Sequence, residues 1–181
     1  MTLDRPRKWG HAWRVGDIER VPEPEDGDER SVLLGWLSFH RNALEAKCAG
    51  LSDDQLVERA ASPSPLSLLG LVRHLVEMER VYGVWANGCT CELVWVWGEY
   101  AEDGPDHDFE CDATQVATSM RAWRDEKAST DGTIKKLDLD DSAGANGRTL
   151  RWNLHKLVGE YARHNGHADL IRERIDGVTG E

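Results

Sequence analysis

The sequence predicts an all-α protein, a four-helix bundle with a long irregular loop between its second and third helices. Three observations lead to this prediction. Four long segments carry apolar residues at helical spacing, residues 88–112 lack such spacing, and 181 residues are enough for one domain with a substantial core. Long amphipathic helices bury their apolar stripes against one another, and a bundle is the simplest way to do so.

The first segment runs from Glu29 to about Ala49 and follows a polar arm, residues 1–28, that is rich in proline and acidic residues. Gly50 marks its end, and Ser52 is an N-cap candidate for a short helical turn. Its apolar stripe contains Leu33, Leu37 and Leu44. We expect an extended arm and a bundle that spans residues 29–181.

The second segment begins near Pro65 or Ser67 and runs to about Ala86. The stretch that follows is rich in tryptophan, glycine and acidic residues, and only Leu93–Trp97 could form a short strand there. A loop this long inside a compact domain is often functional. The third segment then extends from about Ala113 to Lys136, and the fourth runs from near Thr149 to about Ile175.

The charge of the chain argues against some function classes. A net charge of -11 disfavours a nucleic-acid partner, because such binding depends on basic residues that neutralise phosphates. No apolar run is long enough to cross a membrane and the first residues are polar, so we expect a cytoplasmic protein. The cysteines, Cys48, Cys89, Cys91 and Cys111, match no zinc-finger spacing, and we expect reduced thiols. The C-x-C pair Cys89 and Cys91 is only a weak signal for a metal or redox site.

The fourth segment carries a group of candidate metal ligands. Glu160 and His164 are four residues apart and His167 follows three residues later, so their side chains lie along one strip of a helix. His74 lies on the flank of the second segment. Two imidazoles and a carboxylate are the ligands of catalytic zinc sites and of non-haem iron(II) sites, which keep positions open. If these two helices pack together, the sequence predicts a metal site inside the bundle.

Each of these residues also has an ordinary structural explanation. His74 could be a histidine at the edge of the core with a satisfied hydrogen bond, and Glu160 could be a solvated acid on a helix surface. His167 could be an extra ligand, or a group that orients a ligand through a hydrogen bond. The other histidines have no candidate ligands beside them and are expected to be surface or packing residues: His11, His40, His107 and His155.

Two long motifs of the chain resemble a known superfamily. L-S-L-L-G-L-V-R-H-L-V-E-M-E-R and E-Y-A-R-H-N-G-H-A-D-L-I-R-E, in this order, resemble the DinB-like (YfiT-like) metal-binding four-helix bundles. The similarity extends from Glu29 to Gly180 and includes K-C-A-G-L-S-D-D-Q-L and I-D-G-V-T-G. It is closest to the actinobacterial mini-circle proteins, a branch of unknown function, and mycothiol-dependent maleylpyruvate isomerase is related. The resemblance implies an up-down-down-up order of helices and, by analogy, a homodimer.

The resemblance also implies a ligand set and a cosubstrate. The superfamily combines one histidine of the second helix with two ligands four apart on the last helix, which here correspond to His74, Glu160 and His164. Many members have histidine at the place of Glu160, whereas the isomerase has glutamate, and many have glutamine where His167 stands. Zinc is the divalent metal we expect first, with nickel and iron as alternatives. The implied cosubstrate is a mycothiol-type thiol, held as a thiolate for attack on a small electrophile.

The function implied by the resemblance is a metal-dependent thiol S-transferase or isomerase. Two other classes stay open on the sequence alone. The bundle could bind metal without turnover, as a stress-response or regulatory protein, or it could be a metal-dependent hydrolase. A hydrolase would need a general base, for which His167 and Glu77 are candidates, although we expect Glu77 to point to solvent.

Overall fold

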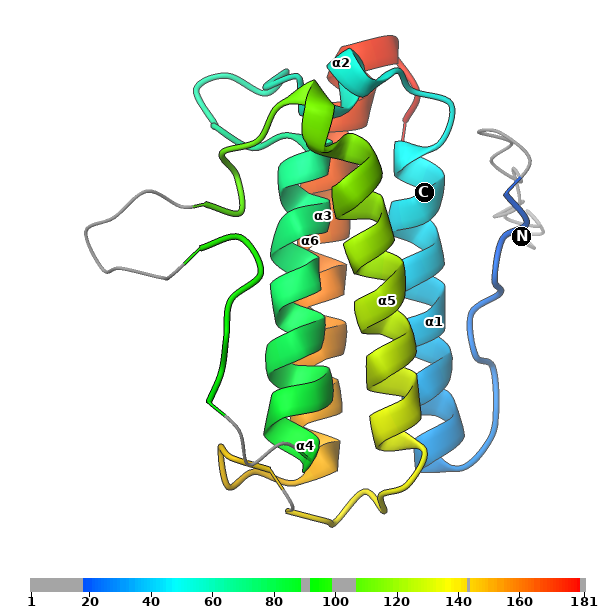
Figure 1. Cartoon of the computed structure of the whole chain (residues 1–181). Helices are drawn as coiled ribbons and strands as arrows, with labels where there is room; N and C mark the ends of the chain where they lie inside the picture. Colours follow the sequence, from blue (N-terminus) through cyan, green and yellow to red (C-terminus); the bar gives the residue numbers. More distant parts are fainter. Residues whose placement is uncertain (1–17, 89–91, 99–106, 143, 180–181) are drawn as a thin grey trace, which may run out of the picture.

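The computed structural model describes residues 18–88, 92–98, 107–142 and 144–179. These residues form an all-α protein whose long helices pack in a bundle, with no strand among them (Figure 1). The predicted fold class is confirmed. Within these same ranges, no helix is long and apolar enough to cross a bilayer.

The directions of the long helices follow the order that the superfamily resemblance implies. In Figure 1, α1 (Glu29–Cys48) and α6 (Leu150–Asp176) run upward, whereas α3 (Leu68–Met78) and α5 (Val116–Ile134) run downward. The order is therefore up-down-down-up, so α3 and α5 are parallel neighbours. α1 packs against α6, and α3 packs against both α5 and α6.

The second predicted segment changes its helical geometry near its end. α3 continues directly into a π-helical stretch, η1 (Glu79–Trp85), and then into α4 (Ala86–Gly88). Its extent agrees with the prediction, but a 3.6-residue pattern does not predict the wider turn. At Gly83 an added Cβ would overlap the Thr130 side chain of α5, so the absence of a side chain there allows the close approach.

Local capping sets several of the helix ends. Ser52 forms a capping box at the start of α2 (Asp53–Val57), as predicted. Ser67 and Thr149 accept hydrogen bonds from the first turns of α3 and α6. Gly177, with a φ of 79°, ends α6 in the left-handed conformation that glycine adopts without strain.

The short strand that the sequence allowed at Leu93–Trp97 does not form, since residues 92–98 are irregular. The backbone N–H groups of Val96 and Trp97 donate to the Glu77 side chain of α3 and not to another strand. This segment is therefore attached to the bundle by side chains of one helix.

A buried polar network crosses the interior. Arg41 of α1 donates to both carboxylate oxygens of Glu79 at 2.7 and 2.6 Å, and to Asp131 at 2.7 Å. The Tyr161 hydroxyl donates to Glu79 Oε1 at 2.7 Å and accepts from Trp123 Nε1 at 2.7 Å. The network joins α1, η1, α5 and α6, and it includes the residue that follows Glu160.

The described part of the N-terminal arm, residues 18–28, lies along α1 (Figure 1). Asn42 of α1 donates to the carbonyl oxygen of Glu19 at 3.0 Å and accepts from the backbone N–H of Val21 at 2.9 Å. Pro24 packs so closely on Gly35 that an added Cβ at Gly35 would come within 2.7 Å of it. These contacts hold the arm against the outer face of α1.

Candidate metal centre

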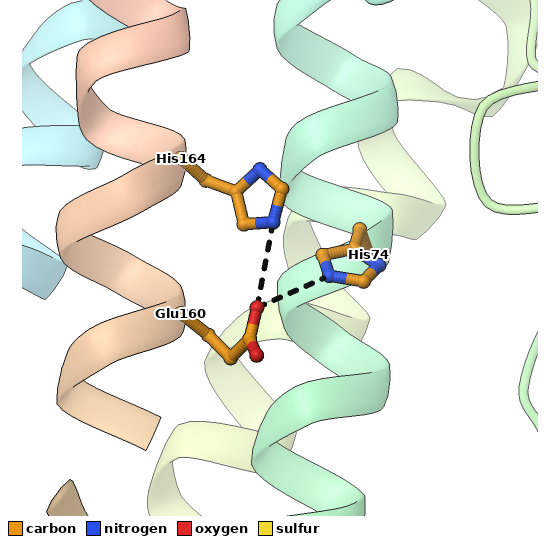
Figure 2. Close-up of side chains that lie close together, drawn as sticks. All are labelled: His74, Glu160 and His164. Atoms are coloured by element: carbon orange, nitrogen blue, oxygen red, sulfur yellow. Dashed lines mark ion pairs between the residues drawn. The ribbon is translucent and has the colours of Figure 1, made fainter. Parts of the chain in front are cut away.

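The packing of α3 against α6 brings His74, Glu160 and His164 together (Figure 2). Glu160 Oε2 lies 3.6 Å from His164 Nε2 and 3.9 Å from His74 Nε2. The three residues each offer one ligand atom, and these atoms all lie within 4.8 Å of one another. Ligand atoms bonded to a tetrahedral ion at about 2.0–2.2 Å would be roughly 3.3–3.6 Å apart, so a small contraction would suit a metal ion.

Helix geometry and burial account for this convergence. Glu160 and His164 are one turn apart on α6, and their residues are only 6% and 8% exposed. His74 faces them from α3, and its side chain is 19% exposed. The site is therefore largely shielded from water.

Both imidazoles have a partner on the nitrogen that faces away from Glu160. His74 Nδ1 lies 3.1 Å from Asp108 Oδ2, and His164 Nδ1 lies 3.3 Å from His167 Nδ1. A proton on Nδ1 of each ligand candidate would leave Nε2 with a free lone pair directed toward the centre. Of the two roles that the sequence left open for His167, this geometry favours that of a group that orients a ligand.

The protonation states suit metal binding. Burial, with additional repulsion from His74 and His167, lowers the pKa of His164 to about 4, so its imidazole is neutral near pH 7. Burial raises the pKa of Glu160, but the hydrogen bond from Lys156 and its charge outweigh this effect and hold the pKa below its ordinary value. Lys156 Nζ binds Glu160 Oε1 at 2.5 Å, which leaves Oε2 toward the imidazoles.

Three residues beside the triad were not foreseen from the sequence. Asp108 and Phe109 come from the loop between the second and third predicted helices, and the Phe109 ring stacks on His74 with centroids 5.6 Å apart. No local signal marks them, because only the fold places that loop next to α3. Lys156, by contrast, lies four residues before Glu160, and this helical spacing is visible in the sequence.

Glu77 corrects a prediction, because it does not point to solvent. The residue is 1% exposed, and its Oε1 accepts hydrogen bonds from Val96 N at 2.6 Å and Trp97 N at 3.2 Å. Residues 92–98 fold back over this face of α3, which helical periodicity alone would leave in water. Burial raises the pKa of Glu77 from 4.5 to about 7, although the hydrogen bond from Val96 opposes the shift.

The raised pKa of Glu77 predicts a pH-dependent stability. The folded protein keeps a proton that the unfolded chain has lost, so the free energy of unfolding should fall as pH rises from 4.5 to about 7. We expect a loss of roughly 1–3 kcal/mol over this range, which Glu77→Gln should largely abolish because an amide cannot ionise. Urea unfolding at a series of pH values measures the free energy of unfolding. Glu58→Gln, which replaces an exposed glutamate, is the control. An unchanged slope in Glu77→Gln would contradict this explanation.

The remaining histidines and cysteines agree with the sequence-based expectations where they are described. His155 is exposed, and His40 packs at the surface against Trp36 with ring centroids 5.7 Å apart. Cys48 is buried, with a pKa that burial raises to about 12, which makes its thiol unreactive. His11, Cys89 and Cys91 lie outside the described residues.

Comparison with known proteins identifies the family of the chain. A family model described as Mycothiol-S-transferase matches residues 32–177, which include nearly the whole bundle and all three residues of the triad. Searches of the curated proteins and of the solved structures gave no significant match. The match covers well over half of the chain and agrees with the all-α fold and with a site that could hold a metal ion. The chain therefore belongs to the mycothiol S-transferase family of DinB-like helical proteins.

Proposed function

We propose that the protein is a metal-dependent mycothiol S-transferase in which His74, Glu160 and His164 hold a divalent metal ion. The observation that carries this proposal is the convergence of two imidazole Nε2 atoms on one carboxylate oxygen, with both Nδ1 atoms partnered elsewhere. Zinc suits this donor set best, and nickel or iron(II) are the alternatives. Three protein ligands would leave at least one position for a thiol.

The reaction joins the thiol sulfur to a small electrophile. The thiol releases its proton to the solvent, and the sulfur forms a bond to the electrophilic carbon. The leaving group departs with the electron pair of the broken bond. A bound divalent cation supplies the charge that lowers the pKa of a thiol.

The residues around the triad support this chemistry. Lys156 keeps one oxygen of Glu160 occupied, so the other oxygen faces the imidazoles. The Phe109 ring, stacked on His74, shields one face of that imidazole from water. Arg163, whose guanidinium lies 3.7 Å from Glu160 Oε2, adds positive charge at the exposed edge of the site. We infer that this edge receives the thiol cosubstrate, since a thiolate is attracted to positive charge.

The hydrolase alternative has lost one of its two candidate bases. Glu77 is 1% exposed, and its Oε1 accepts hydrogen bonds from the backbone of residues 96 and 97, so its carboxylate is buried beneath this segment. His167 is the other candidate for a general base, and its Nδ1 contacts His164, a ligand candidate. S-transfer therefore accounts better for the site and for the family match.

The proposed activity can be tested with zinc-reconstituted protein that carries no His-tag. Mycothiol and monobromobimane would be the substrates, and thioether formation would be measured by chromatography. We expect turnover above the uncatalysed rate, its loss with a chelator and its recovery with zinc. His155→Ala, on the exposed side of α6, should keep the activity. Stoichiometric zinc binding without thioether formation from a panel of electrophiles would support metal binding without turnover.

A further inference from the structure

We propose that Asp108 and Arg73, which lie outside the ligand set, position His74 and thereby control the metal affinity of the site. This inference rests on the proposed function, because it assigns a task to residues around the same centre. Three successive contacts carry it, from His74 outward to Trp97.

The first contact joins Asp108 to His74. The carboxylate Oδ2 lies 3.1 Å from His74 Nδ1, and the two side chains are only 20% and 19% exposed. A carboxylate that accepts this proton fixes the tautomer and the rotation of the ring, and makes the other nitrogen a stronger ligand. Phe109, the next residue, stacks on the same imidazole. Asp108 therefore contacts one edge of the His74 ring, and Phe109 packs on one of its faces.

The second contact holds the backbone that carries Asp108. Arg73 Nε donates to the carbonyl oxygen of Asp108 at 2.9 Å, and Arg73 Nη2 donates to that of His107 at 2.7 Å. The guanidinium belongs to a residue that is 3% exposed, so these hydrogen bonds are protected from competing water. Arg73 and His74 are neighbours on α3. The same turn of α3 therefore carries His74 and Arg73. Arg73 holds the backbone of Asp108, and the Asp108 carboxylate orients His74.

The third contact holds Arg73 itself. Its guanidinium lies over the Trp97 ring, 4.1 Å from the centroid, and Trp97 Nε1 donates to the Arg73 carbonyl oxygen at 3.0 Å. On the other side, Gly70 lets the loop come close to α3. A Cβ at Gly70 would lie 3.2 Å from Phe109 Cα, which is tighter than ordinary packing. Two contacts therefore set the position of Asp108: the Trp97 ring holds Arg73, which binds the Asp108 backbone, and Gly70 allows the neighbouring Phe109 to pack closely on α3.

A second arginine, Arg80 of η1, which continues α3, provides a matched comparison. Arg80 Nη1 donates to the carbonyl oxygen of Val94 at 2.9 Å, and its guanidinium also pairs with Glu126. Arg80 thus attaches residues 92–98, whereas Arg73 attaches the residues that reach His74. If the arginines served only to hold the loop, both should influence the site in the same way.

The test measures zinc affinity by competition with a chelating dye, on the full-length chain and without an activity assay. Asp108→Asn keeps the shape of the side chain and removes its charge, and should weaken zinc binding about 10- to 100-fold. Arg73→Lys replaces the planar fork of the guanidinium with a single ammonium group and should weaken zinc binding about tenfold. Arg80→Lys should leave the affinity within about twofold. The visible spectrum of the cobalt(II)-substituted protein should change in Asp108→Asn and Arg73→Lys only.

The outcomes separate this inference from the proposed function. Wild-type protein that binds zinc, together with Asp108→Asn of equal affinity and an unchanged cobalt spectrum, would overturn the inference and leave the ligand set intact. Wild-type protein that binds none of zinc, nickel, iron(II) and cobalt(II) would overturn both. Circular dichroism checks that each variant is folded. If Arg73→Lys does not fold, the zinc affinity and the cobalt spectrum of the near-isosteric Asp108→Asn variant test the inference.

Discussion

Replacing His164 with alanine is expected to remove the bound metal from the protein. Wild-type protein should carry roughly one divalent ion per chain, and the variant close to none, because two remaining ligands do not hold such an ion tightly. His74→Ala should have the same effect, since its Nε2 is the only proposed ligand atom from α3. Elemental analysis by mass spectrometry of protein purified without a His-tag measures the content directly.

The control for this experiment is His155→Ala. His155 lies on α6 like His164, but it is exposed, and its Nδ1 contacts the carbonyl oxygen of Arg151 at 2.9 Å. Its replacement should leave the metal content unchanged. A His164→Ala protein with the metal content of the wild type would show that the ligand assignment is wrong.

Replacing Arg41 with methionine is expected to produce the largest loss of stability. The Glu79 side chain is completely buried, and the variant would leave its carboxylate with the Tyr161 hydroxyl but without its guanidinium partner. Breaking a buried ion pair from one side typically costs about 3–5 kcal/mol. Urea denaturation of the metal-free protein would measure this loss as a change in the free energy of unfolding.

Two further variants show whether the isolated charge is the cause. The double variant Arg41→Met with Glu79→Met removes both charges and should recover much of the stability, since apolar replacements of buried pairs are often close to neutral. Glu29 lies on α1 like Arg41 and forms an exposed ion pair with Arg151 of α6. Glu29→Gln breaks this pair and should lower the free energy of unfolding far less than Arg41→Met does. A single Arg41→Met variant as stable as the wild type would contradict this explanation.

The buried network also contributes to the shape of the metal centre. Tyr161 follows Glu160 on α6, and its hydroxyl is bound to Glu79 of η1. This bond joins α6, next to Glu160, to η1, which continues the helix that carries His74. We therefore expect the strongly destabilised Arg41→Met protein to bind zinc less tightly as well.

The sequence by itself predicted the features that depend on neighbours along the chain. The last helix was expected from near Thr149 to about Ile175 and extends over Leu150–Asp176. Helical hydrogen bonds and caps join residues at most a few positions apart, so their signals are local. The same holds for Glu160 and His164, because a spacing of four residues brings two side chains together on any helix.

Only the tertiary structure decided which residues surround that pair. Asp108 reaches His74 across 34 positions of the chain, and Glu77 is buried by a segment 19 and 20 residues later. Neither contact follows from helical periodicity, which describes one face of a helix and not what covers the other. The sequence determined the helices and the spacing of the candidate ligands on α6. The packing of Asp108 and Phe109 against α3 determined the environment of His74. Such contacts between distant residues form only when the whole chain is packed.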